Sequence, residues 1–219
     1  MYQPPHFRED DLAAQHGLIR SRPLGTLVTI DAAGGLVANP LPFLLDGASP
    51  LGTLRAHLAR ANRQWRDLQD GGAPREALVI FQGVDGYVTP SWYATKREHG
   101  KVVPTWNYAA VHVGWPVRVI EDRAWLARQV ADLTALKEAG RAEPWAVTDA
   151  PAPFVEAQLK GIVGLELPIA RIEGKWKVSQ NRPEPDRAGV VAGLNAEGDE
   201  ATSAMARLVE VRGVPREPG

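Results

Sequence analysis

The side chains best suited to hold an anion lie at residues 55–65, where a predicted strand passes into a predicted helix. His57 and Arg60 stand near Asn62, and asparagine is a favoured residue at a helix N-cap. Free N–H groups at a helix start attract anions, so with Arg60 and His57 beside them they would bind a phosphate dianion. A capped helix with a solvated basic face explains the same residues, and for this segment alone it is the commoner arrangement.

Aromatic and polar side chains are interleaved in a second segment, at residues 90–108. It holds Pro-Ser-Trp-Tyr at 90–93, and Thr105, Trp106 and Asn107 within Val-Pro-Thr-Trp-Asn-Tyr at 103–108. Aromatic rings cover the faces of a planar heteroaromatic ligand, while amide and hydroxyl groups match the polarity of its edge. Aromatic residues packed in the wall of a β-barrel are the alternative, which spacing alone favours.

Polar donors are dense in a third segment, residues 173–183, at the end of a predicted strand. It contains Lys177, Ser179 and Gln180, each with at least one side-chain donor. A solvated loop is the simpler interpretation, but the neighbouring Trp176 and the number of amide and hydroxyl groups weaken it. In none of the three segments does the pattern identify a catalytic acid or base.

The composition excludes several classes of site. The 219 residues contain no cysteine, which excludes disulfides, thiolate catalysis and cysteine-bound zinc or iron–sulfur centres. No two of the five histidines have the His-x-x-x-His spacing, so we expect no metal site. The sequence has no Walker loop, no Gly-x-Ser-x-Gly elbow and no Gly-x-Gly-x-x-Gly after a strand, so hydrolase, NTPase and Rossmann functions lack a signal.

Charge and hydropathy give expectations about partners and location. The formal net charge of -1 at pH 7 does not favour DNA binding, because DNA-binding proteins draw most of their affinity from clustered Lys and Arg. No stretch approaches the roughly 18 apolar residues of a membrane span, and the first residues lack the pattern of a signal peptide. We therefore expect a cytoplasmic protein with no membrane partner.

Short extended segments dominate the predicted secondary structure. Residues 24–30 and 36–46 predict a hairpin around a Gly-rich turn, and Pro40 and Pro42 favour an edge strand or a bulge there. Further strands are predicted at 51–58, 77–81, 86–89, 111–113, 117–120, 162–167 and 169–172. Helices are predicted at 63–69, ended by Asp70-Gly71-Gly72, at 123–138, at 151–159 and twice beyond 186. This order predicts a mainly β fold, a barrel with peripheral helices, rather than a doubly wound sheet.

A series of motifs resembles, in order, the signatures of the PaiB-type FMN-binding negative transcriptional regulators. They are Met-Tyr at 1–2 with Phe7, His-Leu-Ala-Arg-Ala-Asn at 57–62, Pro-Ser-Trp-Tyr at 90–93, Val-Pro-Thr-Trp-Asn-Tyr at 103–108, Val-His-Val at 111–113, Ile-Val-Gly at 162–164 and Lys-Val-Ser-Gln-Asn-Arg at 177–182. The similarity covers residues 1–194, which we predict to be an FMN-binding split-barrel domain. Residues 195–219 are predicted to be a C-terminal helical extension and tail.

The resemblance implies a split β-barrel related to the pyridoxamine-phosphate-oxidase-like flavoproteins. It also implies a homodimer that holds FMN in clefts at the subunit interface. By this similarity the FMN phosphate is held by the segment that contains His57, Arg60 and Asn62, where the residue chemistry independently predicts an anion. The remaining cleft residues that the resemblance implies are Thr105, Trp106, Asn107, Lys177, Ser179 and Gln180, the last three supplied by either chain.

Three functions are consistent with these observations. The first is a regulatory FMN-binding protein that acts indirectly, because no helix-turn-helix is evident and the chain is slightly acidic. The alternative is an FMN-dependent NAD(P)H oxidoreductase resembling flavin reductases, in which the flavin supplies the chemistry. The third is a binding module that contains no flavin.

Overall fold

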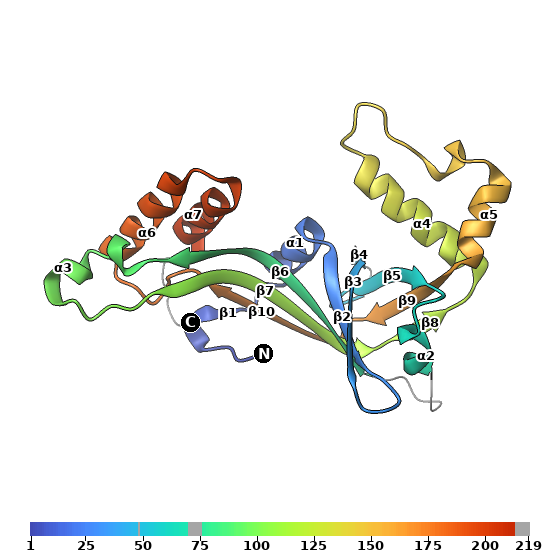
Figure 1. Cartoon of the computed structure of the whole chain (residues 1–219), viewed down its shortest axis with the longest axis horizontal. Coiled ribbons are helices and arrows are strands. Elements are labelled where there is room, and N and C mark those ends of the chain that lie inside the picture. Colours follow the sequence, from blue (N-terminus) through green and yellow to red (C-terminus); the bar gives the residue numbers. More distant parts are fainter. Residues whose placement is uncertain (48, 70–75, 213–219) are drawn as a thin grey trace. The chain divides into compact units, whose positions relative to one another are not determined.

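The computed structural model describes residues 1–47, 49–69 and 76–212, and its chain divides into two compact units. Unit 1 comprises Met1–Leu18, Gln82–His112 and Glu173–Gly219, and unit 2 comprises Ile19–Phe81 and Val113–Ile172. Two long strands, β6 (Glu76–Val88) and β7 (Thr105–Pro116), are neighbours in one sheet (Figure 1). Both contribute residues to both units. No helix within the described residues is long and apolar enough to cross a membrane.

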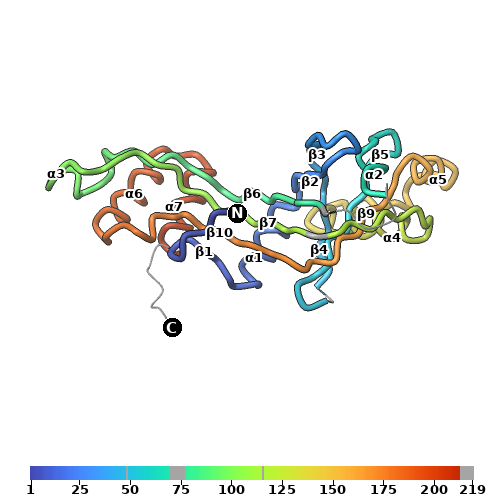
Figure 2. Tube along the Cα trace, turned by 90° about the horizontal axis from the view of Figure 1, so that it is seen from below, coloured from blue at the N-terminus to red at the C-terminus, as the bar shows by residue number. Residues whose placement is uncertain are grey.

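In unit 1 the strand order is β1-β10-β7-β6, where β1 is Arg8–Glu9 and β10 is Arg171–Lys177. The short helices are η1 (Pro5–Phe7), η2 (Pro90–Trp92) and α3 (Thr95–His99), while α1 (Leu12–Ser21) begins here. Helices α6 (Glu184–Glu197) and α7 (Glu200–Arg212) lie side by side (Figure 2). Helix α6 packs on η2, and a Cβ atom at Gly193 would lie 2.2 Å from the Trp92 ring. Glycine is therefore required at this close approach.

In unit 2, β6 continues the order β6-β2-β3, with β2 at Leu24–Ile30 and β3 at Leu36–Pro42. A second, antiparallel sheet has the order β4-β5-β9-β8, formed by Leu44–Asp46, Thr53–Ala59, Ile162–Pro168 and Arg118–Ile120. The helical elements are α2 (Gln64–Gln69), α4 (Arg123–Glu138), η3 (Val147–Asp149) and α5 (Ala152–Lys160) (Figure 1).

Alternation along β5 assigns its two faces. Leu54, Ala56 and Leu58 are buried in the core, so Arg55 and His57 point to the opposite face. Helix α4 contacts both β5 and β9, and it also packs against α5 and η3. The side chains of Arg55 and His57 consequently lie on the face of β5 that these helices cover.

The predicted antiparallel, mainly β fold with peripheral helices is confirmed. The hairpin is formed by β2 and β3 with Ile30 opposite Leu36, and the prolines lie in edge strand β3 as predicted. The sequence missed α1 and α3, and it divided β6 into two strands. At Gly83 a Cβ atom would lie 3.0 Å from Leu18 and 3.1 Å from Ala109, so this glycine marks close packing within a continuous strand rather than a break.

Some predictions lie outside the described residues. The helix stop at Asp70-Gly71-Gly72 and the end of the predicted tail at 213–219 belong to this group. The strand predicted at 169–172 has the wrong bounds. In the structure β9 ends at Pro168, and the next strand, β10, begins at Arg171 and continues to Lys177. The domain boundary at 194/195 stays a prediction.

Candidate functional site

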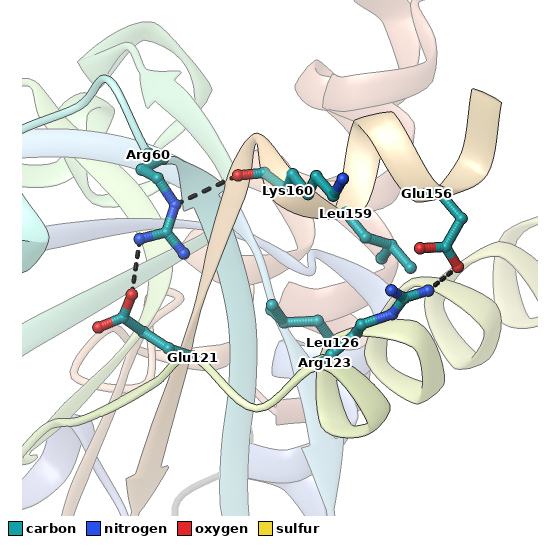
Figure 3. Close-up of a pocket in the computed structure, with 7 residues that line it drawn as sticks. All are labelled: Arg60, Glu121, Arg123, Leu126, Glu156, Leu159 and Lys160. Atoms are coloured by element: carbon teal, nitrogen blue, oxygen red, sulfur yellow. Dashed lines mark hydrogen bonds and ion pairs between the residues drawn. The ribbon is translucent and has the colours of Figure 1, made fainter. Parts of the chain in front are cut away.

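Arg60 is held in place immediately after β5 by contacts on several sides of its guanidinium group. Its Nη1 donates to the Glu121 carboxylate at 2.6 Å, and its Nε donates to the Lys160 carbonyl oxygen at 3.2 Å (Figure 3). The group also lies 5.7 Å from the centre of the Trp65 ring. With 39% of its side chain exposed, Arg60 is positioned but still accessible to an incoming anion.

Arg60 lines a pocket of about 190 Å³ in unit 2. This cationic pocket is lined by Arg60, Glu121, Arg123, Leu126, Glu156, Leu159 and Lys160 (Figure 3). Arg123, the first residue of α4, forms an ion pair with Glu156 of α5. Three cationic and two anionic side chains leave the pocket with one net positive charge. An anion that replaced the carboxylates would find two guanidinium forks and one ammonium group.

His57 and Asn62 lie in other surroundings. The predicted capping role of Asn62 is confirmed, since its Oδ1 accepts a hydrogen bond of 3.0 Å from the Gln64 N–H at the start of α2. His57 lines a different, mainly apolar pocket, and its Nδ1 is buried with no hydrogen-bond partner among the described residues. Burial lowers the pKa of its imidazole. The structure thus places Arg60 and His57 in separate pockets, and a shared phosphate site stays a prediction.

A cluster of polar side chains forms in unit 1 where β7 begins and β10 ends. This polar cluster surrounds a small pocket of about 40 Å³, lined by Tyr93, Thr105, Asn107, Lys177, Ser179, Asn181 and Arg182. Thr105 and Asn107 share one face of β7 because side chains alternate along a strand. Lys177 Nζ donates to the Thr105 hydroxyl group, and Asn107 Nδ2 donates to Ser179 Oγ at 2.9 Å.

The electrostatics of the polar cluster favour an anionic or electron-rich partner. Burial, followed by the positive charges of Lys175 and Arg182, lowers the pKa of Lys177. Burial also raises the pKa of Tyr93, whose hydroxyl oxygen is buried with no hydrogen-bond partner in the described structure. The Arg182 guanidinium lies 4.6 Å from the centre of the Tyr93 ring and opposes that rise. A negative charge at this position would relieve the repulsion among the cations.

Trp106 and Gln180 adjoin the polar cluster without lining its pocket. The Trp106 side chain is 54% exposed and meets the Tyr87 ring edge to face, with 6.1 Å between the ring centres. Gln180 folds back on its own turn, accepting from the Val178 N–H at 2.7 Å and donating to the Trp176 carbonyl oxygen at 2.5 Å. These bonds hold the turn in which Ser179 adopts a φ of 66°. Gln180 therefore positions Ser179.

The structure brings together four of the nine predicted site residues and places Trp106 and Gln180 beside them, whereas His57, Arg60 and Asn62 belong to unit 2. Thr105, Asn107, Lys177 and Ser179 share one small pocket. The sequence missed Arg123 and Lys160 around Arg60, and it missed Tyr93 and Arg182 as lining residues of the polar cluster. Tyr93 and Arg182 lie within the motifs at 90–93 and 177–182, so the motifs themselves could have identified both residues as part of the site. Arg123 and Lys160 carry no such signal, because the packing of α4 and α5 brings them together.

Comparison with known proteins identifies the family. The family model described as "Putative FMN-binding domain" matches residues 1–171. The chain belongs to this FMN-binding family. A protein of Emericella nidulans described as uncharacterised is 35% identical over 97% of this chain and 98% of its own length. The Bacillus subtilis protein named Protease synthase and sporulation protein PAI 2 is 32% identical over 96% of this chain and 97% of its own length.

A solved structure shares the fold of this chain. The FAD and haem binding protein from Mycobacterium smegmatis superposes with a TM-score of 0.58 and 20% identity, covering 78% of this chain and 73% of that chain. The predicted split-barrel fold and the PaiB-type resemblance are confirmed. FMN is the cofactor that the family match assigns to the chain.

Taken by itself, each of these two pockets fits one polar part of FMN. A phosphate dianion requires cationic forks, and the cationic pocket offers Arg60 and Arg123 with Lys160 beside them. The polar edge of a flavin ring requires hydrogen-bond donors and a nearby positive charge, and the polar cluster offers Asn107, Ser179 and Lys177.

Proposed function

We propose that this protein binds FMN with its phosphate in the cationic pocket of unit 2. The observation that carries the proposal is the convergence of Arg60, Arg123 and Lys160 on one pocket in a member of an FMN-binding family. Both arginines are held by carboxylates, Glu121 and Glu156, so the guanidinium groups keep their positions before a ligand arrives. Preorganised donors bind an anion with a smaller entropic cost than free side chains do.

We also propose that the polar cluster of unit 1 binds the polar edge of a flavin ring, with the phosphate of that FMN held by a cationic pocket of either chain of a homodimer. Asn107 and Ser179 form hydrogen bonds with each other, so their orientations are fixed, and Gln180 holds the turn beneath Ser179. Lys177 supplies a cation that would favour the negative charge of a reduced flavin. FMN supplies reversible electron transfer when bound, and these side chains would orient the ring and tune its potential. A contact between His57 and FMN stays a prediction.

The protein is expected to bind FMN about tenfold or more tightly than riboflavin, which lacks the phosphate. Charge-assisted hydrogen bonds to a phosphate contribute roughly 1.5–3 kcal/mol each, so losing them costs at least a factor of ten. The measurement is a titration of apoprotein with each flavin, followed by flavin fluorescence. Arg123→Ala should reduce the preference for FMN, whereas Lys137→Ala should keep it, since Lys137 lies exposed at the other end of α4.

A variant of the polar cluster tests the proposed contact with the flavin ring independently of the proposed contact with the phosphate. Lys177→Met should weaken FMN and riboflavin alike, because both share the flavin ring. Equal affinities of the wild-type protein for FMN and riboflavin would contradict the phosphate assignment. Failure to take up either flavin would contradict the function itself.

We infer that any regulatory role is indirect and that the protein acts as a homodimer. The name of the Bacillus subtilis relative connects that protein with protease synthesis and sporulation. The formal net charge of -1 at pH 7 gives the chain little overall attraction to a DNA backbone. Exposed apolar side chains on paired strands, Ile30 at 53% and Leu36 at 79%, support self-association.

One solution experiment tests both statements. Light scattering of the FMN-loaded protein after size exclusion should give twice the chain mass of 23.8 kDa, unchanged when duplex DNA is added at physiological salt. A single-chain mass would refute the homodimer. Co-elution with sequence-specific DNA would refute indirect action.

A further inference from the structure

The apolar pocket that His57 lines is distinct from both clusters assigned to FMN. It lies in unit 2, where β5, β9, α4, the segment at 139–150 and α5 meet, and its volume is about 220 Å³. Most of its lining is aliphatic or aromatic, including Val130, Trp145, Phe154 and Val155. Leu159 lines this apolar pocket and the cationic pocket, so the two are neighbours with different chemistry.

The size of the apolar pocket indicates a small ligand. An apolar cavity of roughly 150 Å³ accepts benzene, so about 220 Å³ holds one substituted ring or two fused rings. Trp145 and Phe154 remain 48% and 56% exposed, an unusual exposure for two large aromatic side chains that line the same pocket. Their rings would cover an aromatic guest through offset or edge-to-face contacts.

The polar groups of the lining restrict the charge of that ligand. His57 is the one ionisable side chain among the described lining residues, accompanied by the amide of Gln158. Its lowered pKa keeps the imidazole largely uncharged near pH 7, where it has one donor and one acceptor nitrogen. A charged ligand would lose its hydration against this lining without gaining a counter-ion. A hydroxyl group, which both donates and accepts, suits either tautomer of the ring.

We propose that this pocket is a second ligand site, which binds a small uncharged aromatic molecule bearing a hydroxyl group. His57 forms the polar end of the site, and Val130, Val155 and the rings of Trp145 and Phe154 form its apolar walls. The site adds to FMN binding and does not depend on it. The helices that carry it, α4 and α5, also carry Arg123 and Lys160, so its occupant contacts the elements that shape the cationic pocket.

The test uses the FMN-treated full chain and 2-naphthol as the probe. Calorimetry should show saturable binding of one 2-naphthol per chain, and an excess of FMN should leave its affinity unchanged. His57→Phe should weaken 2-naphthol about tenfold, the effect of one lost hydrogen bond, without weakening naphthalene. Naphthalene-2-sulfonate, which has the same rings with a charge, should bind more weakly than 2-naphthol.

A second variant fills the site instead of removing its polar end. Val155→Phe should reduce 2-naphthol affinity at least tenfold while FMN uptake stays at the wild-type level, which shows that the chain is folded. Val211→Phe, the same substitution at a position that is 73% exposed on α7, should change neither. Competition between FMN and 2-naphthol, or an affinity unaffected by Val155→Phe, would overturn the proposed second site.

Discussion

Replacing Glu121 by Gln is expected to tighten FMN binding several-fold, whereas replacing Arg60 by Ala should weaken it by roughly 10- to 100-fold. Glu121 accepts a hydrogen bond of 2.6 Å from Arg60 and therefore competes with a phosphate for the same guanidinium edge. Its carboxylate also repels the phosphate dianion. The amide of Gln removes the charge but keeps the shape, so Arg60 becomes more available to the anion.

Opposite changes in FMN affinity on substituting Arg60 and Glu121, the two partners of one ion pair, distinguish a role in ligand binding from a role in stability. If Arg60 only supported the fold, both substitutions would weaken the same contact and would act in the same direction. Asp132→Asn is the matched control, since it releases Arg55 from a similar ion pair of 2.9 Å outside the lining of the cationic pocket. It should leave FMN affinity unchanged. Weaker FMN binding by the Glu121→Gln protein would refute the competition argument.

Riboflavin provides the second readout for the same variants. Because it lacks the phosphate, its affinity should respond little to either Arg60→Ala or Glu121→Gln. A parallel loss of FMN and riboflavin affinity in the Arg60→Ala protein would point to a distorted unit 2 rather than to a lost phosphate contact.

Local chemistry predicted the regular elements of this fold well. The hairpin predicted from residues 24–30 and 36–46 forms between Leu24–Ile30 and Leu36–Pro42, but the end of the second run, Leu44–Asp46, is a separate strand of the other sheet. The apolar face of residues 123–138 forms α4 as predicted. The long strands were harder to predict. Residues 105–108 hold two aromatic residues, an amide and a hydroxyl group, which suggested a binding segment, yet they begin the continuous strand β7. Their strand conformation depends on pairing with distant β10 and β6, and short windows of sequence do not contain that information.

The candidate site shows the same division between local and distant determinants. Asn62 caps α2 through a contact two residues away, so the sequence predicted it. Lys177 meets Thr105 because β10 and β7 are neighbours in the sheet, a relation that only the family resemblance suggested. Arg123 and Glu156 meet through the packing of α4 on α5. Nothing in the spacing of two residues 33 positions apart (156 minus 123) predicts that encounter.

Substituting Gly164 by Ala is expected to be among the most damaging single changes in unit 2. Gly164 pairs with His57 across β5 and β9, on the face that α4 covers, and a Cβ atom there would lie 2.3 Å from the Trp125 ring. Overpacking of this kind costs about 1–3 kcal/mol of unfolding free energy, and more where the neighbour has little freedom. Trp125 lies in the first turn of α4, where its backbone N–H donates to the capping Asp122 carboxylate at 2.7 Å. Because this bond holds the backbone in place, the ring can make room for a Cβ atom at position 164 only by changing rotamer or by displacing α4.

Trp125 lies two residues after Arg123 at the start of α4, so a shift of its ring also affects ligand binding. A displaced α4 moves Arg123 in the cationic pocket and Val130 in the apolar pocket, so Gly164→Ala should weaken both FMN and 2-naphthol. Gly17→Ala is the control, because nothing lies within 4 Å of a Cβ atom there and the change should slightly stabilise α1.

A double-mutant cycle decides whether the clash with Trp125 is the cause. Trp125→Ala removes the ring and should itself destabilise unit 2, but Gly164→Ala added to it should then cost little, because the space is empty. Denaturant unfolding of the four proteins should give a coupling free energy of about 1–3 kcal/mol between the two positions. If the two losses of unfolding free energy were additive, Gly164 would be required for the backbone conformation of β9 and not for the packing of α4 on that strand. In that case the FMN and 2-naphthol sites would no longer share α4 as their common support.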